Sequence, residues 1–483
     1  MASLEEIREA RLKKLEALCE AGIDPYPAKV PRDFDISELK DNFEKHERSG
    51  ETVSVSGRIM AIRGQGAILF AVLYDGSDSV QAIFKKDQMA EKAFFLFTET
   101  ADIGDFISVT GKAALSKTGE KSILADTWVM AAKSLAPLPE KWHGLQDIEE
   151  RYRKRYLDIL MNPELRDLLV KKSKFWEVTR NFMKERGFLE IETPTLELTT
   201  GGAEARPFKT HHNDFDLDMY LRISVGELWQ KRLMAAGFPK TFEIGRIYRN
   251  EGTSPEHLQE FTNMEFYWGY ADYRDGMNLV KDLYRSLATE VFGKTEFEYG
   301  GHSFDLGGEW KEIDYKEEIE RQTGIDIDNA TEGEMRDKLD ELKVPYQGEN
   351  RERLTDTLWK FCRKNISGPA FLVGHPALVA PLAKRIPGKD ATQMFQPIIA
   401  GSEVGRGYSE LNDPIDQRQR FDIQAELVES GDEEAMMSDY EFVEMLEHGM
   451  PPTCGFGFGE RLFAILAGKP LRELQTFPLM RPK

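Results

Sequence analysis

The segment APLPEKWHG at residues 136–144 divides the chain into two parts with different residue patterns. Before it, residues 52–130 alternate apolar and polar side chains in short runs separated by turns such as DGSDS and KTGE. About five short strands of this kind predict a small closed barrel, for which the oligonucleotide-binding fold is one solution among several. After it, helix and strand patterns alternate. Two prolines and a glycine in the segment are typical of a domain boundary.

The expected organisation has an N-terminal helical segment at 1–50, the barrel at 51–140 and a larger domain at 141–483. In the larger domain, PELRDLLVKKSKFWEVTRNFMKERG predicts a helix that ends near Gly187, and FLEIETPTL predicts a strand. Residues 310–365 are charged and helical and are interpreted as an insertion.

Composition narrows the class of protein. A net charge of -20 argues against non-specific coating of nucleic acid, which requires lysine and arginine. The densest basic run, RYRKRY, is equally well interpreted as a solvated linker or as a local basic face. No apolar run is long enough to cross a bilayer, and the charged N-terminus does not resemble a secretory signal. Three well-separated cysteines predict reduced thiols in a cytoplasmic protein.

The runs TFEIGRIYR and EFTNMEFYWGYADY predict an antiparallel hairpin with a long polar connection, RNEGTSPEHLQEF. Side chains two positions apart share one face of a strand, so Glu265 lies with Phe261 and Tyr267. A half-buried carboxylate there needs a partner, either a distant arginine or a cationic ligand. In the connection, Arg249 suits a phosphate or carboxylate, or a surface ion pair. His257 is either a proton carrier or a loop donor.

Two further clusters lie toward the C-terminus. GSEVGRGYSELNDP brings Glu403, Tyr408 and Glu410 together among glycines, which allow a ligand to approach the backbone. This density of acids indicates a metal that bridges phosphates, a pocket for a cation, or a turn with exposed acids. In GFGFGERL, alternate glycines leave one strand face bare beside Arg461, which suits a planar or phosphorylated ligand. Its spacing matches neither the Walker A loop nor the dinucleotide fingerprint.

In this order, the three segments resemble the signature motifs of class II aminoacyl-tRNA synthetases. Their residues are most similar to those of lysyl-tRNA synthetases. HGLQDIEERYRKRYLDI, GGAEARPFKTHHNDFDLDMYLRI, FEIGRIYRNEG, EFTNMEFYWGYADY and YSELNDP carry the resemblance, which covers nearly the whole chain. It implies an α+β fold, with an N-terminal oligonucleotide-binding β-barrel for the anticodon and a catalytic domain built on an antiparallel sheet flanked by helices. It also implies a homodimer, with the helix at 165–187 and the strand that ends at Pro194 in the interface motif. The barrel positions matched to anticodon contacts are Arg63, Phe70 and Gln81.

The reaction that the resemblance implies has two steps. L-lysine reacts with ATP, assisted by Mg²⁺, to give lysyl-adenylate, and lysine is then transferred to the 3′ end of tRNA(Lys). Arg249 matches the arginine on the amino-acid carboxylate and the α-phosphate, and Arg461 matches the arginine at the γ-phosphate. Glu403 matches a magnesium ligand. The other matched ATP positions are Glu251, His257 and the adenine-stacking Phe261.

The matched lysine pocket is chemically coherent. Two carboxylates, Glu265 and Glu410, facing a tyrosine suit a terminal ammonium, whereas an aspartate-specific relative would need a cation there. Analogues without the ammonium would leave the carboxylates unpaired, so a proofreading domain is not needed. The positions matched to amino-acid binding are Gly202, near the α-amino group, with Glu227, Arg249, Glu265, Tyr267, Tyr408 and Glu410.

The chain departs from the family pattern at several positions. Arg406 stands where asparagine is usual, Gln396 where a second acidic metal ligand is expected, and Leu258 where asparagine follows the histidine. SVGEL has one residue more than the usual form, and GFGFGER one fewer.

Two other functions compete with the ligase. One is a catalytically altered paralogue that binds tRNA or a partner protein as a regulator. Loss of Arg249, Glu265 or Arg461 would favour it, and all three are present. The other is a paralogue that attaches a lysine isomer to a protein. Such relatives typically lack the barrel that is expected here.

Overall fold

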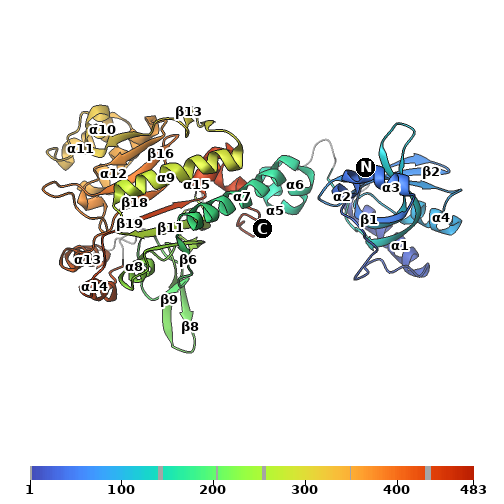
Figure 1. Cartoon of the computed structure of the whole chain (residues 1–483), viewed down its shortest axis with the longest axis horizontal. Coiled ribbons are helices and arrows are strands. Elements are labelled where there is room, and N and C mark those ends of the chain that lie inside the picture. The colour runs from blue at the N-terminus through green and yellow to red at the C-terminus, as the bar shows by residue number, and fades with distance from the viewer. Residues whose placement is uncertain are drawn as a thin grey trace. The chain divides into compact units, whose positions relative to one another are not determined.

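The computed structural model describes residues 3–139, 145–202, 205–252, 257–346, 348, 350–429 and 437–482. The chain forms two compact units, residues 1–147 and 148–483, which are described separately (Figure 1). Within the described ranges, no helix has the length and apolarity to cross a membrane.

The first unit is built on a closed barrel with strand order β1-β2-β3-β5-β4. Alternate residues fill its interior, as in β2, where Leu69, Ala71 and Leu73 are buried. The sequence therefore predicted the barrel correctly. Its strands are β1 Thr52–Gln65, β2 Ile68–Tyr74, β3 Ser79–Lys85, β4 Phe106–Leu115 and β5 Lys121–Ala132, and helix α4 spans Glu91–Thr100.

The helices of residues 1–50 belong to the same unit as the barrel. Leu18, Ile36 and Phe43 are buried in one hydrophobic cluster with the barrel strands. They were expected as a separate segment because local pattern does not report what an amphipathic helix packs against. These helices are α1 Leu4–Glu20, α2 Ile36–Asp41 and α3 Phe43–Ser49.

The second unit is built on a nine-stranded sheet with the order β14-β15-β16-β18-β19-β11-β10-β6, and β17 pairs with β16. The central pairs are antiparallel, while the edge pairs β14–β15 and β10–β6 are parallel. The expected antiparallel sheet is thus right for the centre that carries the site. Its strands are β6 Leu189–Glu190, β10 Lys240–Tyr248, β11 Glu260–Gly269, β14 Lys311–Asp314, β15 Ala370–Val373, β16 Met394–Ile399, β17 Ser402–Glu403, β18 Arg406–Ser409 and β19 Thr453–Gly459.

Helices flank this sheet, and α8 packs on β10 and β11 (Figure 1). Helix α9 packs on β16, β18 and β19, and α7 packs on β10 and β6. Their apolar side chains share the main core with Phe266 and Phe456 of the strands. The helices are α5 Ile148–Arg153, α6 Arg155–Met161, α7 Pro163–Glu185, α8 Glu227–Ala235, α9 Tyr273–Leu287, α13 Pro414–Glu429, α14 Tyr440–Glu447 and α15 Arg461–Ala467, with one-turn or irregular segments η1 Ala288–Phe292, η2 Arg363–Asn365, η3 Ala377–Val379 and η4 Leu471–Leu474.

The basic run RYRKRY is neither a solvated linker nor an open basic face. It lies in α5 and α6, where Arg155 is buried and paired with Asp158 at 2.7 Å. Arg153 and Lys154 pair with Glu149 and Glu150, four residues before each. Acidic residues one helical turn before these basic residues allow i,i+4 pairing, which the count of basic residues alone does not show.

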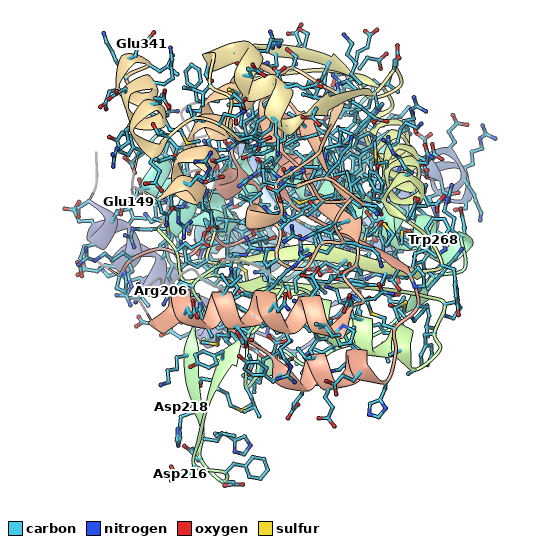
Figure 2. All side chains as sticks on the ribbon, turned by 90° about the vertical axis from the view of Figure 1, so that its left-hand side faces the viewer. Glu149, Arg206, Asp216, Asp218, Trp268 and Glu341 are labelled. Atoms are coloured by element: carbon cyan, nitrogen blue, oxygen red, sulfur yellow. The ribbon has the colours of Figure 1, made fainter. Side chains whose placement is uncertain are left out.

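The charged segment at 310–365 forms three helices whose hydrophobic cluster also includes Ala370, Leu372 and Ile398 of β15 and β16, and β14 at its start joins the main sheet. These helices are α10 Tyr315–Thr323, α11 Glu332–Glu341 and α12 Arg351–Cys362. A separate hairpin extends from the unit, with Asp216 and Asp218 near its tip (Figure 2). The remaining strands are β7 Leu196–Glu197, β8 Lys209–His212 and β9 Leu217–Leu221 in one small sheet, and β12 Glu296–Tyr299 and β13 His302–Asp305 in another.

Candidate functional site

A cavity of about 350 Å³ lies on the face of the sheet away from α9. Its floor is β19, whose glycines alternate with core phenylalanines: Gly455 faces the cavity, and Phe456 is buried behind it. On either side, β11 and β18 pair with β19 in register. The cavity lining includes all twelve residues predicted from the catalytic motifs: Gly202, Glu227, Arg249, Glu251, His257, Phe261, Glu265, Tyr267, Glu403, Tyr408, Glu410 and Arg461.

Glu265 is buried at one end of the cavity. Its oxygens accept hydrogen bonds from the amide of Val225 at 2.7 Å, from Asn263 at 3.3 Å and from the hydroxyl of Tyr267 at 3.2 Å. Burial, with the nearby carboxylate of Glu227, raises the pKa of Glu265 to about 7. The ion pairs of the described residues do not include Glu265, and the charge of the buried Arg249 only partly offsets the effect of burial on its pKa. The structure thus favours a cationic ligand as its partner.

Two further carboxylates, Glu227 and Glu410, lie beside Glu265, and a lysine that sequence reasoning missed lies between them. Lys231 is buried, with Nζ 2.8 Å from Glu227 Oε1 and 2.6 Å from Glu410 Oε2. The hydroxyl of Tyr408 also donates to Glu227 Oε1. Lys231 follows Glu227 by four residues on α8, so the helical i,i+4 rule was the available signal. Its contact with Glu410 joins segments far apart in sequence and had no local signal.

Charge at this end of the cavity is only partly balanced. Burial raises the pKa of Glu410 to about 8; Lys231 acts against this, and Glu227 and Glu265 add to it. Burial alone would lower the pKa of Lys231, but its two carboxylate partners raise it above the ordinary value. Three carboxylates therefore face one internal ammonium. A cationic ligand would stabilise the ionised forms of Glu265 and Glu410, whose pKa values are raised.

Two arginines lie at the other end. Arg249 directs its Nε and Nη2 toward the carbonyl oxygen of Ile223 at 3.4 Å, and its guanidinium lies 5.5 Å from the Phe261 ring centroid. Burial lowers its pKa, while Glu251 acts in the opposite direction. Arg461, the first residue of α15, donates to the carbonyl of Glu403 at 3.4 Å. Two guanidiniums that line the cavity together form a site for an anion.

The contacts of Glu403 show how its carboxylate could bind a metal ion. Its oxygens accept from Trp359 Nε1 at 2.8 Å and from Gln396 Nε2 at 3.2 Å, and Gln396 is held in turn by His375 at 2.8 Å. Although burial raises its pKa, Arg363 and Arg406 hold the pKa of Glu403 below the ordinary value. The described residues contain no group of three acids, histidines or cysteines able to hold a metal. The carboxylate fits magnesium only as a single protein ligand, with phosphates completing the shell.

Arg406 and Leu258, two departures from the family pattern, also line the cavity. Arg406 is exposed on β18 and its backbone pairs with Gly457, while the side-chain hydrogen bonds and ion pairs of the described residues do not include it. Leu258 packs against the main hydrophobic core, which explains why an apolar side chain is tolerated there. In the loop before it, residues 253–256 lie outside the described residues.

The predicted anticodon residues lie together on the barrel. Arg63 pairs with Phe70 between β1 and β2, and Gln81 of β3 pairs with Val72, two residues further along β2. Cross-strand partners share a face, and this face is opposite the buried Leu69 and Ala71. Gln81 donates to the hydroxyl of Ser122 at 3.0 Å. The three side chains therefore form one outward-facing patch.

Comparison with known proteins agrees with this arrangement. Residues 147–481 match the family model for class II tRNA synthetases (D, K and N), and residues 53–131 match the OB-fold nucleic acid binding domain. The chain belongs to the class II tRNA synthetases. Among its relatives are proteins named lysine–tRNA ligase from Roseiflexus sp., 42% identical over 99% of both chains, and from Thermotoga maritima, 41% identical over 99% of this chain and 97% of the relative. A third, from Halalkalibacterium halodurans, is 41% identical over 99% of this chain and 98% of the relative.

Proposed function

We propose that the protein is a lysine–tRNA ligase, which activates L-lysine with ATP and transfers it to tRNA(Lys). The observation that carries this proposal is Glu265, a buried carboxylate in the cavity with only neutral donors around it. A terminal ammonium at the end of an alkyl chain would satisfy it, together with Glu410 and Tyr267. The full-length relatives named lysine–tRNA ligase support the same substrate.

In the first step, an oxygen of the lysine carboxylate attacks the α-phosphorus of ATP, and pyrophosphate leaves. Arg249 orients the carboxylate and the α-phosphate and offsets the charge that develops on the phosphate oxygens. Arg461 does the same toward the γ-phosphate, and the ring of Phe261 stacks on the adenine. Glu251 and His257 contact ATP from the loop above. This step depends on positioning and electrostatics rather than on a proton carrier.

Magnesium, when bound, supplies positive charge to the phosphates, and we assign its protein ligand to Glu403 alone. Trp359 and Gln396 orient this carboxylate. In the second step, the terminal ribose hydroxyl of the tRNA attacks the carbonyl carbon of lysyl-adenylate, and AMP leaves. Glu227 and Gly202 hold the α-amino group, and Tyr408 orients Glu227 through their hydrogen bond.

The barrel is assigned to anticodon binding, with Phe70 stacking on a base and Arg63 and Gln81 donating hydrogen bonds. We further propose a homodimer that uses α7 and the segment that ends at Pro194, and a cytoplasmic location. The cysteines Cys19, Cys362 and Cys454 are free thiols, as expected in a reducing compartment.

Lysine-dependent exchange between ATP and pyrophosphate tests the first step, with arginine, ornithine and aspartate as competitors. Only lysine is expected to support rapid exchange, and Arg249→Ala is expected to lower kcat by about 10²–10³-fold. Arg274→Ala is the matched control, because Arg274 forms an ion pair with Glu312 and does not line the cavity. Exchange with another amino acid but not with lysine would contradict the pocket assignment. Wild-type exchange in Arg249→Ala would contradict the role of that arginine.

A further inference from the structure

Lys231 contacts one oxygen of each of two carboxylates, and the other oxygen of each carboxylate faces the cavity. Its Nζ contacts Glu227 Oε1 and Glu410 Oε2 at 2.8 and 2.6 Å. Glu227 Oε2 is directed toward Gly202, where it would lie 2.5 Å from a Cβ built on that glycine. Glu410 Oε1 is directed toward Gly455, where a Cβ would overlap it. One ammonium thus leaves two separate oxygens facing the cavity.

We propose that Lys231 is a positioning residue that fixes the spacing of two cation sites and thereby selects the length of the amino-acid substrate. The inference rests on the proposed function, in which the α-ammonium of lysine lies at Glu227 and its ε-ammonium at Glu410 and Glu265. Lys231 itself is buried and is not among the residues that line the cavity.

The charges support this role. Glu227, Glu265 and Glu410 carry three negative charges when ionised, and Lys231 reduces the net charge to two. Lysine brings two ammonium groups, so the pocket and the two ends of the substrate are matched. Without Lys231, the carboxylates would repel one another and take up protons or turn away, because buried like charges are costly.

The surroundings make the spacing rigid. Glu227 and Lys231 are one turn apart on α8, and the helix is held by Gln230, which donates to the carbonyl of Val225 at 2.9 Å and accepts from Thr241 of β10 at 2.9 Å. The Lys231 Nζ also lies 5.5 Å from the ring centroid of Tyr408. The ion pair between Lys231 and Glu410 therefore connects α8 to the segment that follows β18. The distance between the two cation sites is set by this ion pair.

The test compares Lys231→Met with Lys231→Arg in ATP–pyrophosphate exchange, using lysine and ornithine, which is one methylene shorter. In Lys231→Met, KM for lysine is expected to rise about a hundredfold, since two buried carboxylates lose their partner. The preference for lysine over ornithine is expected to fall by about tenfold or more. KM for ATP is expected to stay within about twofold, because the arginine end of the cavity is unchanged.

Lys231→Arg separates spacing from charge. The larger guanidinium of arginine keeps the positive charge but displaces the two carboxylates. The preference for lysine over ornithine is therefore expected to stay reduced. Arg232→Met is the control, since Arg232 lies next on α8 and forms its own ion pair, with Asp439 at 2.9 Å, outside the cavity. Thermal unfolding of each variant reports whether the fold is intact.

The outcomes are distinct. An unchanged ratio of lysine to ornithine in a folded Lys231→Met protein would overturn the spacing role while leaving the ligase function intact. Full restoration of affinity and preference by Lys231→Arg would assign Lys231 to charge balance alone and overturn the spacing role as well. Absence of lysine-dependent exchange in the wild-type protein would overturn both the inference and the proposed function.

Discussion

On the proposed assignment of the substrate ammonium to Glu265 and Glu410, lysine binding is expected to release a proton, because burial raises the pKa of both carboxyls. Burial raises the pKa values of Glu265 and Glu410 to about 7 and about 8, and the two groups influence each other. With these values, the pair carries roughly one proton at pH 7. An ammonium between them favours the form in which both are ionised, so its binding expels that proton.

The sign and size of the effect follow from linkage. Because the ligand-bound form holds fewer protons, affinity for lysine rises with pH. The expected slope is about tenfold per pH unit between pH 7 and 8, and it flattens above pH 8 as both acids ionise without ligand. The same dependence is expected in kcat/KM for lysine in the exchange reaction.

Isothermal titration calorimetry at pH 7 in buffers of different ionisation enthalpy measures the number of protons released. A value near one is expected for the wild-type protein. Glu197→Gln is the control, because burial also raises the pKa of Glu197 to about 7, but this residue does not line the cavity. That variant should release the same proton on binding lysine. Release close to zero with an affinity independent of pH would refute the assignment of the ammonium to Glu265 and Glu410.

Four shorter predictions concern other parts of the chain. Gly455→Ala places a methyl group against Glu410, so kcat/KM for lysine is expected to fall about a hundredfold or more in exchange assays, with KM for ATP retained. Phe70→Ala is expected to lower kcat/KM for tRNA by about 5–150-fold in aminoacylation, from lost stacking, without changing exchange. Arg406→Asn is expected to raise the pKa of Glu403, because Arg406 helps to hold that pKa below its ordinary value, and the pH dependence of the exchange reaction checks this. The folded-state pKa of Glu197, about 7 against 4.5, means that stability falls as pH rises from 4.5 to 7, by about 3 kcal/mol, and denaturant unfolding of Glu197→Gln should lack this part of the pH dependence.

Features of the site that depend on period-two alternation could be predicted from the sequence. Glu265 and Tyr267 face the cavity while Phe266 lies in the core, as the strand pattern indicates. The β10–β11 hairpin was predicted for the same reason, and its register joins Glu243 to Glu265. Alternation decides which face a side chain occupies before any tertiary contact is known.

Features that depend on contacts across the fold could not be predicted. Lys231 reaches Glu410 only because α8 packs beside the sheet, and nothing in either segment indicates the other. The edge position of β14 is similar, since its parallel partner β15 follows a long helical insertion. The hydrogen bond from Trp359 to Glu403 likewise connects this insertion, whose sequence is mostly charged, to the site. Local pattern fixes elements, whereas their partners are decided by the assembled core.

The glycines of β19 explain why one cavity accommodates both ends of an elongated ligand. Glu265 and Arg406 flank Gly457, and Tyr267 and Tyr408 flank Gly455, so the two walls are in register across a floor without side chains. Alternate residues of a strand are about 6.6–6.8 Å apart, so each glycine adds roughly that length to the trough. A substituent at any of these glycines would meet a wall residue, as a Cβ at Gly457 would meet Glu265 at 2.8 Å. The missing side chains, as much as the charged ones, therefore leave room along β19 for the elongated ligand of the proposed function.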